Sequence, residues 1–519
     1  MVAALDKSVG LDGVMSPPSS PQMWMDYLSS KLSSRSGRYK RFGEYYDGKH
    51  QKMLFAQSKF RTEFAHVFER WNDNFCGLVI DSVNERMFID GFRLSKEPTE
   101  DELAREIWQR NRMDSESNSA HLDAMIQGAA YAIVWGQELS DPRVGGSNAQ
   151  DKDAGPGKKV KAVISVESAE HVVVQYRPGS RHEIEAAAKF YVDDWGRQFC
   201  TLWLADSVHV GNWKIGGYVI DGPARRNPLG VVPVVPIQNR ARLVGEPMSD
   251  LATVIPLQDA INKTVADSLV ASEYAAWPQR YVTGLEIQED ENGNPIEPFK
   301  VAVDKLLQAE DPAATFGQFE AANLSNYVDL VDMLTMHMAS VARVPFHYML
   351  KGGQPPSGDA ITSAEAGLVS KVKERMLHFG EAWERVIKIA IAVENGGQLQ
   401  EEYEAAEVIW RDPENRTEAQ HIDALLKLQQ LNVPKQQLWQ DAGYTPSQIA
   451  RFDQLLEEEA QTEMERADKY QTAAQKQELE LAKQGADDKS AMTQAKAKKD
   501  AEKPPQGNSG NANRKRFEK

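Results

Sequence analysis

The first chemistry that residue spacing suggests is a phosphate-binding loop, at Gly43-Glu-Tyr-Tyr-Asp-Gly48-Lys49-His50. Such a loop cradles phosphates with backbone N–H groups, neutralises charge with its lysine and holds magnesium with a following Ser or Thr. Here His50 takes the Ser/Thr position, and the preceding stretch Arg38-Tyr-Lys-Arg-Phe42 is not an apolar strand. Two tyrosines and an aspartate would also crowd the cradle. The pattern therefore favours a structural turn over a nucleotide site.

The second chemical pattern is the pair His182-Glu183, which begins like the metal-binding motif of a zinc peptidase. The second histidine would fall at position 186, which is alanine. The ten histidines contain no i, i+4 pair beside an acid, and His337 and His347 fit core or cap positions at the ends of apolar helices. No nucleophile elbow is present either. The sequence therefore predicts no catalytic centre, no metal site and no cofactor.

Two other segments carry charge or flexibility that a ligand could use. Lys351-Gly-Gly-Gln-Pro-Pro-Ser-Gly358 cannot be helical, and it presents Lys351 and Gln354 between two helices. Its composition alone favours a flexible surface connection. The helix expected at 251–276 carries four acids and one base on its polar face, which favours an ordinary amphipathic helix with a solvated face.

Composition bounds the class of protein. The chain has 519 residues, of which 41% are hydrophobic and 26% charged, as in a soluble protein with a core and several domains. With 60 Lys+Arg against 76 Asp+Glu, the net charge of −16 excludes a generally basic nucleic-acid coat but not a local patch. Cys76 and Cys200 are too few for a disulfide framework or a Cys-rich zinc site. No apolar run approaches the ~20 residues that span a bilayer, and we expect a cytosolic protein without a membrane anchor.

Hydrophobic periodicity predicts an α+β chain whose β-rich region lies between helical regions. Capping boxes indicate helix starts at Thr99–Glu102 and Thr362–Glu365, and Thr445-Pro446 indicates a third. Apolar spacing places helices at 75–86, from 99 on, and at 119–135, 251–276, 324–342, 362–393, 416–431, 435–441 and from 445 on.

Short strands are expected mainly in residues 160–240, as a small and mostly antiparallel β region. Further strands are predicted at 87–92 and 408–410, and a β-hairpin at 281–303 with Asn292-Gly293 in its turn. The Gly-, Asp- and Lys-rich composition of residues 140–159 predicts an exposed loop. Residues 485–519 are low in complexity and favour a mobile, mildly basic tail.

The ordered series of segments resembles the portal proteins of tailed bacteriophages, in particular those of siphoviruses of actinobacteria. The resemblance covers roughly residues 22–455, and no single motif in it is specific. The segments that carry it are Tyr45-Tyr-Asp-Gly-Lys-His50, Val79-Ile-Asp-Ser-Val-Asn-Glu-Arg86 with Asp90-Gly91-Phe92, Asn227-Pro-Leu-Gly-Val-Val-Pro-Val-Val-Pro-Ile-Gln-Asn239, Leu257-Gln-Asp-Ala-Ile-Asn262, Trp277-Pro-Gln-Arg280, and Val344-Pro345 with Ser357-Gly-Asp-Ala360.

The resemblance implies a portal fold with an α/β wing, a two-helix stem, a small β-containing clip and an α-helical crown. It implies the following parts: a disordered arm at 1–21, wing at 22–247, stem helices at 248–277 and 323–344 around a clip at 278–322, a tunnel loop at 345–361, wing with a long helix at 362–412, a crown at 413–470 and a charged flexible tail at 471–519.

The resemblance also implies a non-enzymatic function. The chain would form a ring, usually of twelve copies, at one capsid vertex, where double-stranded DNA passes during packaging and ejection. Its partners would be the major capsid protein, the large terminase subunit, a head–tail adaptor and a scaffolding protein. We expect it in the virion, and in the host cytoplasm during assembly. An acidic channel would suit DNA that must slide, because each neutralised phosphate adds salt-dependent affinity.

Three sets of residues follow as candidates from this resemblance. They are the DNA-facing loop residues Lys351, Gly352, Gly353, Gln354 and Ser357, the partner-binding clip residues Glu289, Asp290, Glu291 and Asn292, and the channel-lining stem residues Asp259, Asp267 and Glu273. Two alternatives stay open: an NTPase or nuclease of the packaging machinery, and another head–tail connector protein. The defective phosphate loop and the missing metal motif count against the first, and the length of the chain disfavours a small adaptor.

Overall fold

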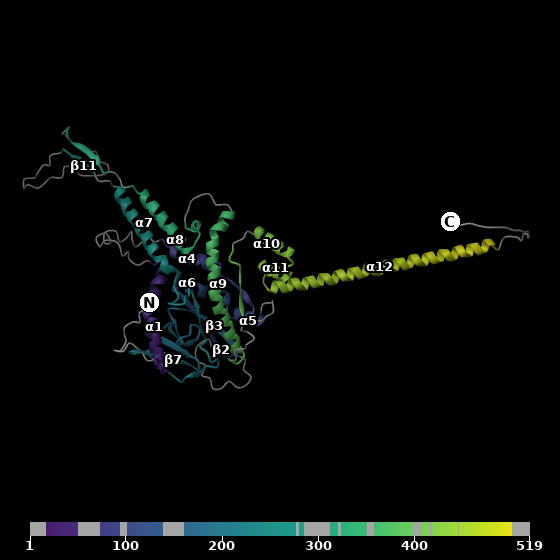
Figure 1. The fold of residues 1–519 in the computed structure, drawn as a ribbon, viewed down its shortest axis with the longest axis horizontal. Coiled ribbons are helices and arrows are strands. Elements are labelled where there is room, and N and C mark those ends of the chain that lie inside the picture. Colours follow the sequence, from purple (N-terminus) through teal and green to yellow (C-terminus); the bar gives the residue numbers. More distant parts are fainter. Residues whose placement is uncertain are drawn as a thin grey trace, which may run out of the picture. The chain divides into compact units, whose positions relative to one another are not determined.

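The computed structural model divides the chain into two units, Met1–Thr417 and Glu418–Lys519, drawn in Figure 1. It describes residues 17–49, 73–93, 101–138, 160–276, 280–284, 312–319, 323–349, 358–397, 406–414, 418–444 and 446–500. Helices and sheets are mixed in the first unit, so the α+β class is confirmed. Residues 1–16 of the arm predicted at 1–21, and the loop predicted at 140–159, lie outside the described residues.

Helix α1 (Pro21–Tyr46) begins the described chain. Ser20 caps it by accepting a hydrogen bond from the backbone N–H of Met23, and proline stands in its first turn, where no helical N–H is needed. Its buried side chains, including Met25, Leu28 and Leu32, form one stripe against the strands that follow. Helix α4 (Phe75–Asn84) and strand β1 (Ile89–Arg93) confirm the predicted helix and strand in this part of the chain.

A three-stranded antiparallel sheet has the order β10-β2-β3, with β2 at Ala129–Glu138, β3 at Val160–Ser168 and β10 at Val234–Gln238. The helix predicted at 119–135 is therefore confirmed only as far as Gln127, and the part beyond it is wrong. Helix α6 (Met113–Gln127) ends where Gly128 adopts a φ of +96°, and the apolar run beyond it is the central strand. Every residue from 129 to 134 is buried, so this apolar run fits the helical period of 3.6 residues as well as a strand that is buried on both faces.

The larger sheet follows as an antiparallel meander, β4-β5-β6-β7-β8, with β9 beside β7. Its strands are β4 (Val172–Tyr176), β5 (Ile184–Val192), β6 (Gln198–Leu204), β7 (Ser207–Lys214), β8 (Gly217–Ile220) and β9 (Arg225–Arg226). The prediction of an antiparallel β region is confirmed, although β7 and β10 were not foreseen. Helix α1 packs on this sheet, and its buried stripe joins the second of two hydrophobic cores.

Two helices, α7 (Ile255–Ala276) and α8 (Ser325–Ala342), lie side by side (Figure 1). The 3-10 turn η1 (Asp250–Thr253) leads into α7, and η2 (Phe346–Tyr348) follows α8. Strand β11 (Arg280–Thr283) pairs with β12 (Thr315–Gln318), a pairing that was not predicted, and the strand expected at 299–303 lies outside the described residues. The predicted turn at Asn292-Gly293 lies outside the described residues.

Helix α9 (Gly358–Glu394) confirms the predicted long helix and packs against β2, β3 and β10. Its predicted start at Thr362 is wrong, because the helix begins at Gly358 and Glu365 makes an ion pair instead of a capping box. Helix α5 (Glu102–Arg110) likewise begins after Asp101, whose carboxylate accepts from the N–H of Ala104 at 2.9 Å, and not at Thr99. Strand β13 (Glu407–Trp410) pairs with β1.

The first hydrophobic core gathers around α9. Trp383 is fully buried, lies 5.4 Å from Trp108 between ring centroids and donates a hydrogen bond from its indole N–H to His121 Nε2 at 2.8 Å. His121 stacks on Phe379 at 5.2 Å. Burial lowers the pKa of His121 to about 3, so its ring is neutral inside the fold.

The second unit contains α10 (Glu418–Gln430), α11 (Lys435–Asp441) and α12 (Pro446–Asp500). The first two confirm their predictions, and α12 begins at the predicted Pro446. Phe452 contacts Trp439 and Tyr444 at centroid distances of 5.5 and 5.1 Å, which fixes the start of α12 on α11. The structure differs from the expected tail at 485–500, which continues as helix, because Ala, Gln, Lys and Glu are strong helix formers.

Candidate functional site

The suspected phosphate loop is part of a helix. Residues 43–46 form the last turn of α1, and the N–H groups of Asp47, Gly48 and Lys49 bond to the carbonyls of residues 43–45 at 2.8–3.3 Å. These N–H groups are therefore not available to cradle a phosphate. Tyr45 is buried, and its hydroxyl donates to Asp259 at 2.6 Å. The structural interpretation of this segment is confirmed over the described residues 43–49.

The suspected zinc motif does not assemble. His182 is exposed, its backbone carbonyl accepts from Arg385 at 2.7 Å, and Glu183 pairs with Arg177 at 2.7 Å. Within the described ranges, no three His, Cys, Asp or Glu side chains gather closely enough to hold a metal ion. Among the helices of the same described ranges, none is both long and apolar enough to cross a membrane.

The candidate residues fall into two groups. The loop residues Lys351, Gly352, Gly353, Gln354 and Ser357 and the clip residues Glu289, Asp290, Glu291 and Asn292 lie outside the described part of the chain. Asp259, Asp267 and Glu273 all lie on α7. Asp259 accepts the bond from Tyr45, and Asp267 makes an i, i+4 ion pair with Lys263. Both carboxylates are half-buried, and their assignment to a channel stays a prediction.

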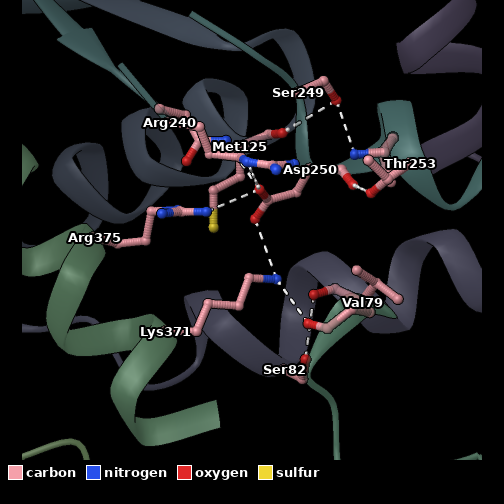
Figure 2. A network of polar contacts seen from close by, with 12 residues as sticks. Val79, Ser82, Met125, Arg240, Ser249, Asp250, Thr253, Lys371 and Arg375 are labelled. Carbon is pink, nitrogen blue, oxygen red and sulfur yellow. Dashed lines mark hydrogen bonds and ion pairs between the residues drawn. The ribbon is translucent and has the colours of Figure 1, made fainter. Parts of the chain in front are cut away.

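The best-defined polar site lies at the base of the α7–α8 pair, around Asp250 (Figure 2). Asp250 is 4% exposed. Its carboxylate lies 3.0 Å from Arg375 NH2 and 3.3 Å from Lys371 Nζ on α9, and 3.9 Å from Arg240 Nε. Asn239 Nδ2 donates to it at 3.3 Å. One buried anion thus joins the turn that starts α7, the loop after β10 and the long helix α9.

Local sequence explains why Asp250 points inward. Ser249 accepts from the N–H of Leu251 at 3.0 Å and donates to the carbonyl of Met125 at 3.3 Å, which fixes the start of η1 on α6 (Figure 2). Leu251 is fully buried. The loop before it is closed by a backbone bond from Met248 to Asn239 at 3.1 Å. The aspartate is therefore held between two anchored neighbours.

Charge balance keeps Asp250 ionised. Burial alone would raise the pKa of its carboxyl, but Lys371 and Arg375, followed by Asn239 and Arg240, hold that pKa below its usual value. Burial lowers the pKa of Lys371, an effect that Asp250 opposes and Arg375 reinforces. Lys371 also donates to the carbonyl of Ala342 at the end of α8 at 3.2 Å. The site therefore connects α9 to the start of α7 and to the end of α8.

A second buried pair lies where α8 leads to α9. Arg86 NH2 is 3.2 Å from Glu365 Oε2 and donates to the Tyr348 hydroxyl at 2.8 Å, and this hydroxyl donates to Glu365 Oε1 at 3.1 Å. Arg86 NH1 donates to the carbonyl of Pro413 at 3.2 Å. Arg86 and Glu365 are 8% and 7% exposed. The residues just before and after the predicted loop are thus held by one arginine.

These buried charges were not foreseen as a site. A charged residue within an apolar stretch was the available signal, since Asp250 precedes Leu251 and Lys371 lies between buried Leu368 and Val372. The partners could not be foreseen, because they are distant in the sequence. What the arrangement can do is mechanical: it fixes the helix pair and both sides of residues 349–358 to the same long helix.

Comparisons with known proteins place this architecture in a class. The chain is a mixed helix-and-sheet protein of the phage portal class, a class of structural components of the virion. The sequence model of the family described as phage portal protein, SPP1 Gp6-like, matches residues 26–466, and the chain belongs to this family. It is similar to the portal protein of Mycobacterium phage L5, at 29% identity over 403 residues, and to that of Mycobacterium phage D29, at 28% over 399. Each alignment covers 74% of this chain and 78% of the relative.

Proposed function

We propose that this chain is the subunit of a ring that forms a DNA channel at one capsid vertex. The ring would dock the terminase motor during packaging and the head–tail adaptor afterwards. The observation that carries the proposal is the family match over residues 26–466, which spans the helix pair and both buried charged sites. The resemblance to actinobacterial siphovirus portals in the sequence and the two mycobacterial phage relatives agree with it.

The parts of the proposed portal fold are assigned from the helix pair outward. Helices α7 and α8 would be the stem, β11 and β12 would belong to the clip, and α9 would be the long wing helix. The two sheets with α1 would form the wing, and α10 and α11 the crown. A stem that transmits force needs a rigid base, and the network at Asp250 supplies buried, charge-assisted contacts there.

Helix α8 supports self-association. One stripe of the helix buries Thr335, Met338 and Ala342, while large apolar side chains elsewhere on the helix are exposed. They are Val328 at 60%, Leu330 at 40%, Met333 at 43%, Met336 at 51% and Val341 at 53% exposure. Five such side chains on one 18-residue helix are expected of a surface that another subunit covers. In a cyclic ring the neighbouring copy would be that partner.

The loop at 345–361 would face the DNA, with Lys351, Gln354 and Ser357 as contacts. The Arg86 site supports this assignment, because it ties Tyr348 to Glu365 on α9 and so anchors the chain on both sides of residues 350–357. Lys351→Glu is expected to reduce DNA packaging or retention, with Lys214→Glu on exposed β7 as a charge-matched control. Equal packaging by both variants would contradict the assignment. Glu289, Asp290, Glu291 and Asn292 would contact terminase or adaptor, and Asp259, Asp267 and Glu273 would make the stem acidic.

The first experiment is negative-stain electron microscopy with native mass on the same sample. The expected result is a closed ring of twelve 58.0 kDa chains, about 700 kDa in total, with a central hole wide enough for a DNA duplex of about 20 Å diameter. Met333→Glu with Met336→Glu should abolish ring formation. As a control, Val192→Glu with Ile215→Glu adds the same charges at exposed apolar positions, at the end of β5 and directly after β7 in the larger sheet. This variant should leave the rings intact. A compact dimer with ATPase activity would overturn the proposal.

A further inference from the structure

A basic pocket lies in the first unit, and none of its lining residues belongs to the Asp250 or Arg86 sites. It is a cavity of about 280 Å³ between α1, the turn joining β4 to β5 and the loop after β10. Five cationic side chains and one carboxylate line it. They are Lys31, Arg35, Arg38, Arg181, Arg242 and Glu246. This concentration of positive charge stands out in a chain whose net charge is −16.

Glu246 cannot balance the five cations. It pairs with Arg35, which is 20% exposed, and with Arg38 at 2.9 Å. Within the part of the chain that the structure describes, no carboxylate forms an ion pair with Lys31, Arg181 or Arg242. Lys31 Nζ donates instead to the carbonyl of Val174 at 3.0 Å and to Gln175 at 2.7 Å. Arg181 donates only to the backbone carbonyl of Arg242, at 2.9 Å.

Like charges held this closely destabilise the fold unless an anion compensates them. Burial and then Arg35 lower the pKa of Lys31 to about 8, and the opposing effect of Glu246 is too small to restore it. Tyr39, Tyr131 and Tyr176 form the remaining wall of the cavity. Gln238 donates to the Tyr176 hydroxyl at 2.6 Å, so this wall is fixed. The pocket is thus built around positive charge that the described chain leaves uncompensated.

We propose that this pocket binds a phosphate group. Four of the five cations are arginines, and the planar guanidinium fork matches the oxygen geometry of phosphate in paired hydrogen bonds. Arg181 and Arg242 come from two different loops, both residues line the cavity, and the Arg181 guanidinium donates to the backbone carbonyl of Arg242. The volume suits a small phosphorylated molecule or one phosphate of a nucleic-acid backbone.

The test uses the full-length protein at low salt, with inorganic pyrophosphate as the probe and citrate as a carboxylate of similar charge. Thermal unfolding and titration calorimetry report binding. We expect pyrophosphate to raise the melting temperature and citrate to have a much smaller effect. Arg181→Gln with Arg242→Gln removes two exposed arginines that hold no carboxylate, and it should weaken pyrophosphate binding at least about tenfold.

The matched control is Arg225→Gln with Arg226→Gln, which removes two exposed arginines of β9 outside the pocket and should bind pyrophosphate like the wild type. A labelled single-stranded oligothymidylate distinguishes the sources of phosphate. Binding that depends on Arg181 and Arg242 indicates a nucleic-acid backbone, and binding of pyrophosphate alone indicates a free phosphorylated molecule. Equal effects of citrate and pyrophosphate, or equal binding by the two double variants, would overturn the proposal.

Discussion

Helices α9 and α12 are the longest that the structure describes, at 37 and 55 residues, and opposite means stabilise them. Helix α9 buries Leu368, Val372, Phe379 and Trp383 along one stripe and adds the buried charges of Lys371 and Arg375. In α12 every described side chain from Gln454 to Lys498 is exposed. The first helix is held by tertiary packing, and the second by the propensity of its own residues.

The difference teaches that helix length in this chain carries no information about stability. Removing a side chain from α9 breaks contacts with sheets and other helices, whereas removing one of the exposed side chains of α12 between Gln454 and Lys498 should break only interactions within that helix. The following four predictions use this contrast, and three of them compare a buried position with a matched position that is more exposed.

The largest effect is expected from Asp250→Asn. It leaves Lys371, Arg375 and Arg240 without their anion, and removing one partner of a buried ion pair costs about 3–5 kcal/mol. The measurement is the free energy of unfolding from urea denaturation. Asp267→Asn on α7 removes a half-exposed i, i+4 pair and should cost no more than about 0.5 kcal/mol. Equal costs would show that the buried network does not stabilise the fold.

A smaller loss is expected from Trp383→Phe. The change keeps an aromatic ring but removes the donor to His121 Nε2, and an unsatisfied buried acceptor costs about 1–3 kcal/mol. Trp195→Phe provides the same substitution at a residue that is 79% exposed, where we expect a change within about 0.5 kcal/mol. Urea denaturation of the two variants side by side checks the contrast, which a similar loss in both would contradict.

The pH dependence tests the same part of the core. His121 has a folded pKa of about 3 against an ordinary value of 6.5, so the unfolded chain binds its proton first as the pH falls. The stability that neutral His121 contributes is fully present well above pH 6.5 and is lost progressively down to about pH 3. From pH 7 to 5.5 the loss is about 1.3 kcal/mol.

The measurement compares the wild type with His121→Gln, in which this loss should disappear. Burial raises the pKa of Asp123 to about 6, which stabilises the fold as the pH falls, but this contribution is common to both proteins and cancels in the difference. Identical pH profiles for the two proteins would rule out a neutral buried His121.

The smallest effect is expected from Leu481→Ala on α12, where the side chain is 62% exposed. Alanine is the better helix former, so the free energy of unfolding should change by less than about 0.5 kcal/mol. Leu368→Ala in α9, where leucine is fully buried, should cost about 2–5 kcal/mol. A loss at Leu481 as large as that at Leu368 would mean that α12 is packed in solution.

The sequence was sufficient where one periodicity dominated. The spacing of α8 predicted its helix to within one residue, and the stripe of α9 predicted a long helix that begins four residues earlier than expected. It misled at 129–134, where residues buried on both sides of a central strand also fit a helix, and the only warning was Gly128. At 485–500 a composition that favours disorder is the same one that favours a solvated helix.

The functional residues were harder to predict, for a physical reason. A buried charge becomes recognisable only with its partners, and Asp250 meets Arg375 across 125 positions of the chain. The basic pocket likewise assembles from three segments, none of them basic enough alone to be noticed. The predicted loop and clip residues came from family resemblance, and they lie outside the described residues.

The Arg86 site also restricts how such a gene can be shuffled. One arginine near the start of the chain contacts Tyr348, Glu365 and Pro413, which come from three later segments. A hybrid with a related phage protein, joined between positions 86 and 348, would inherit the arginine from one parent and its partners from the other. Crossovers in this interval succeed only when both parents carry the same set, so the interval behaves as one heritable block.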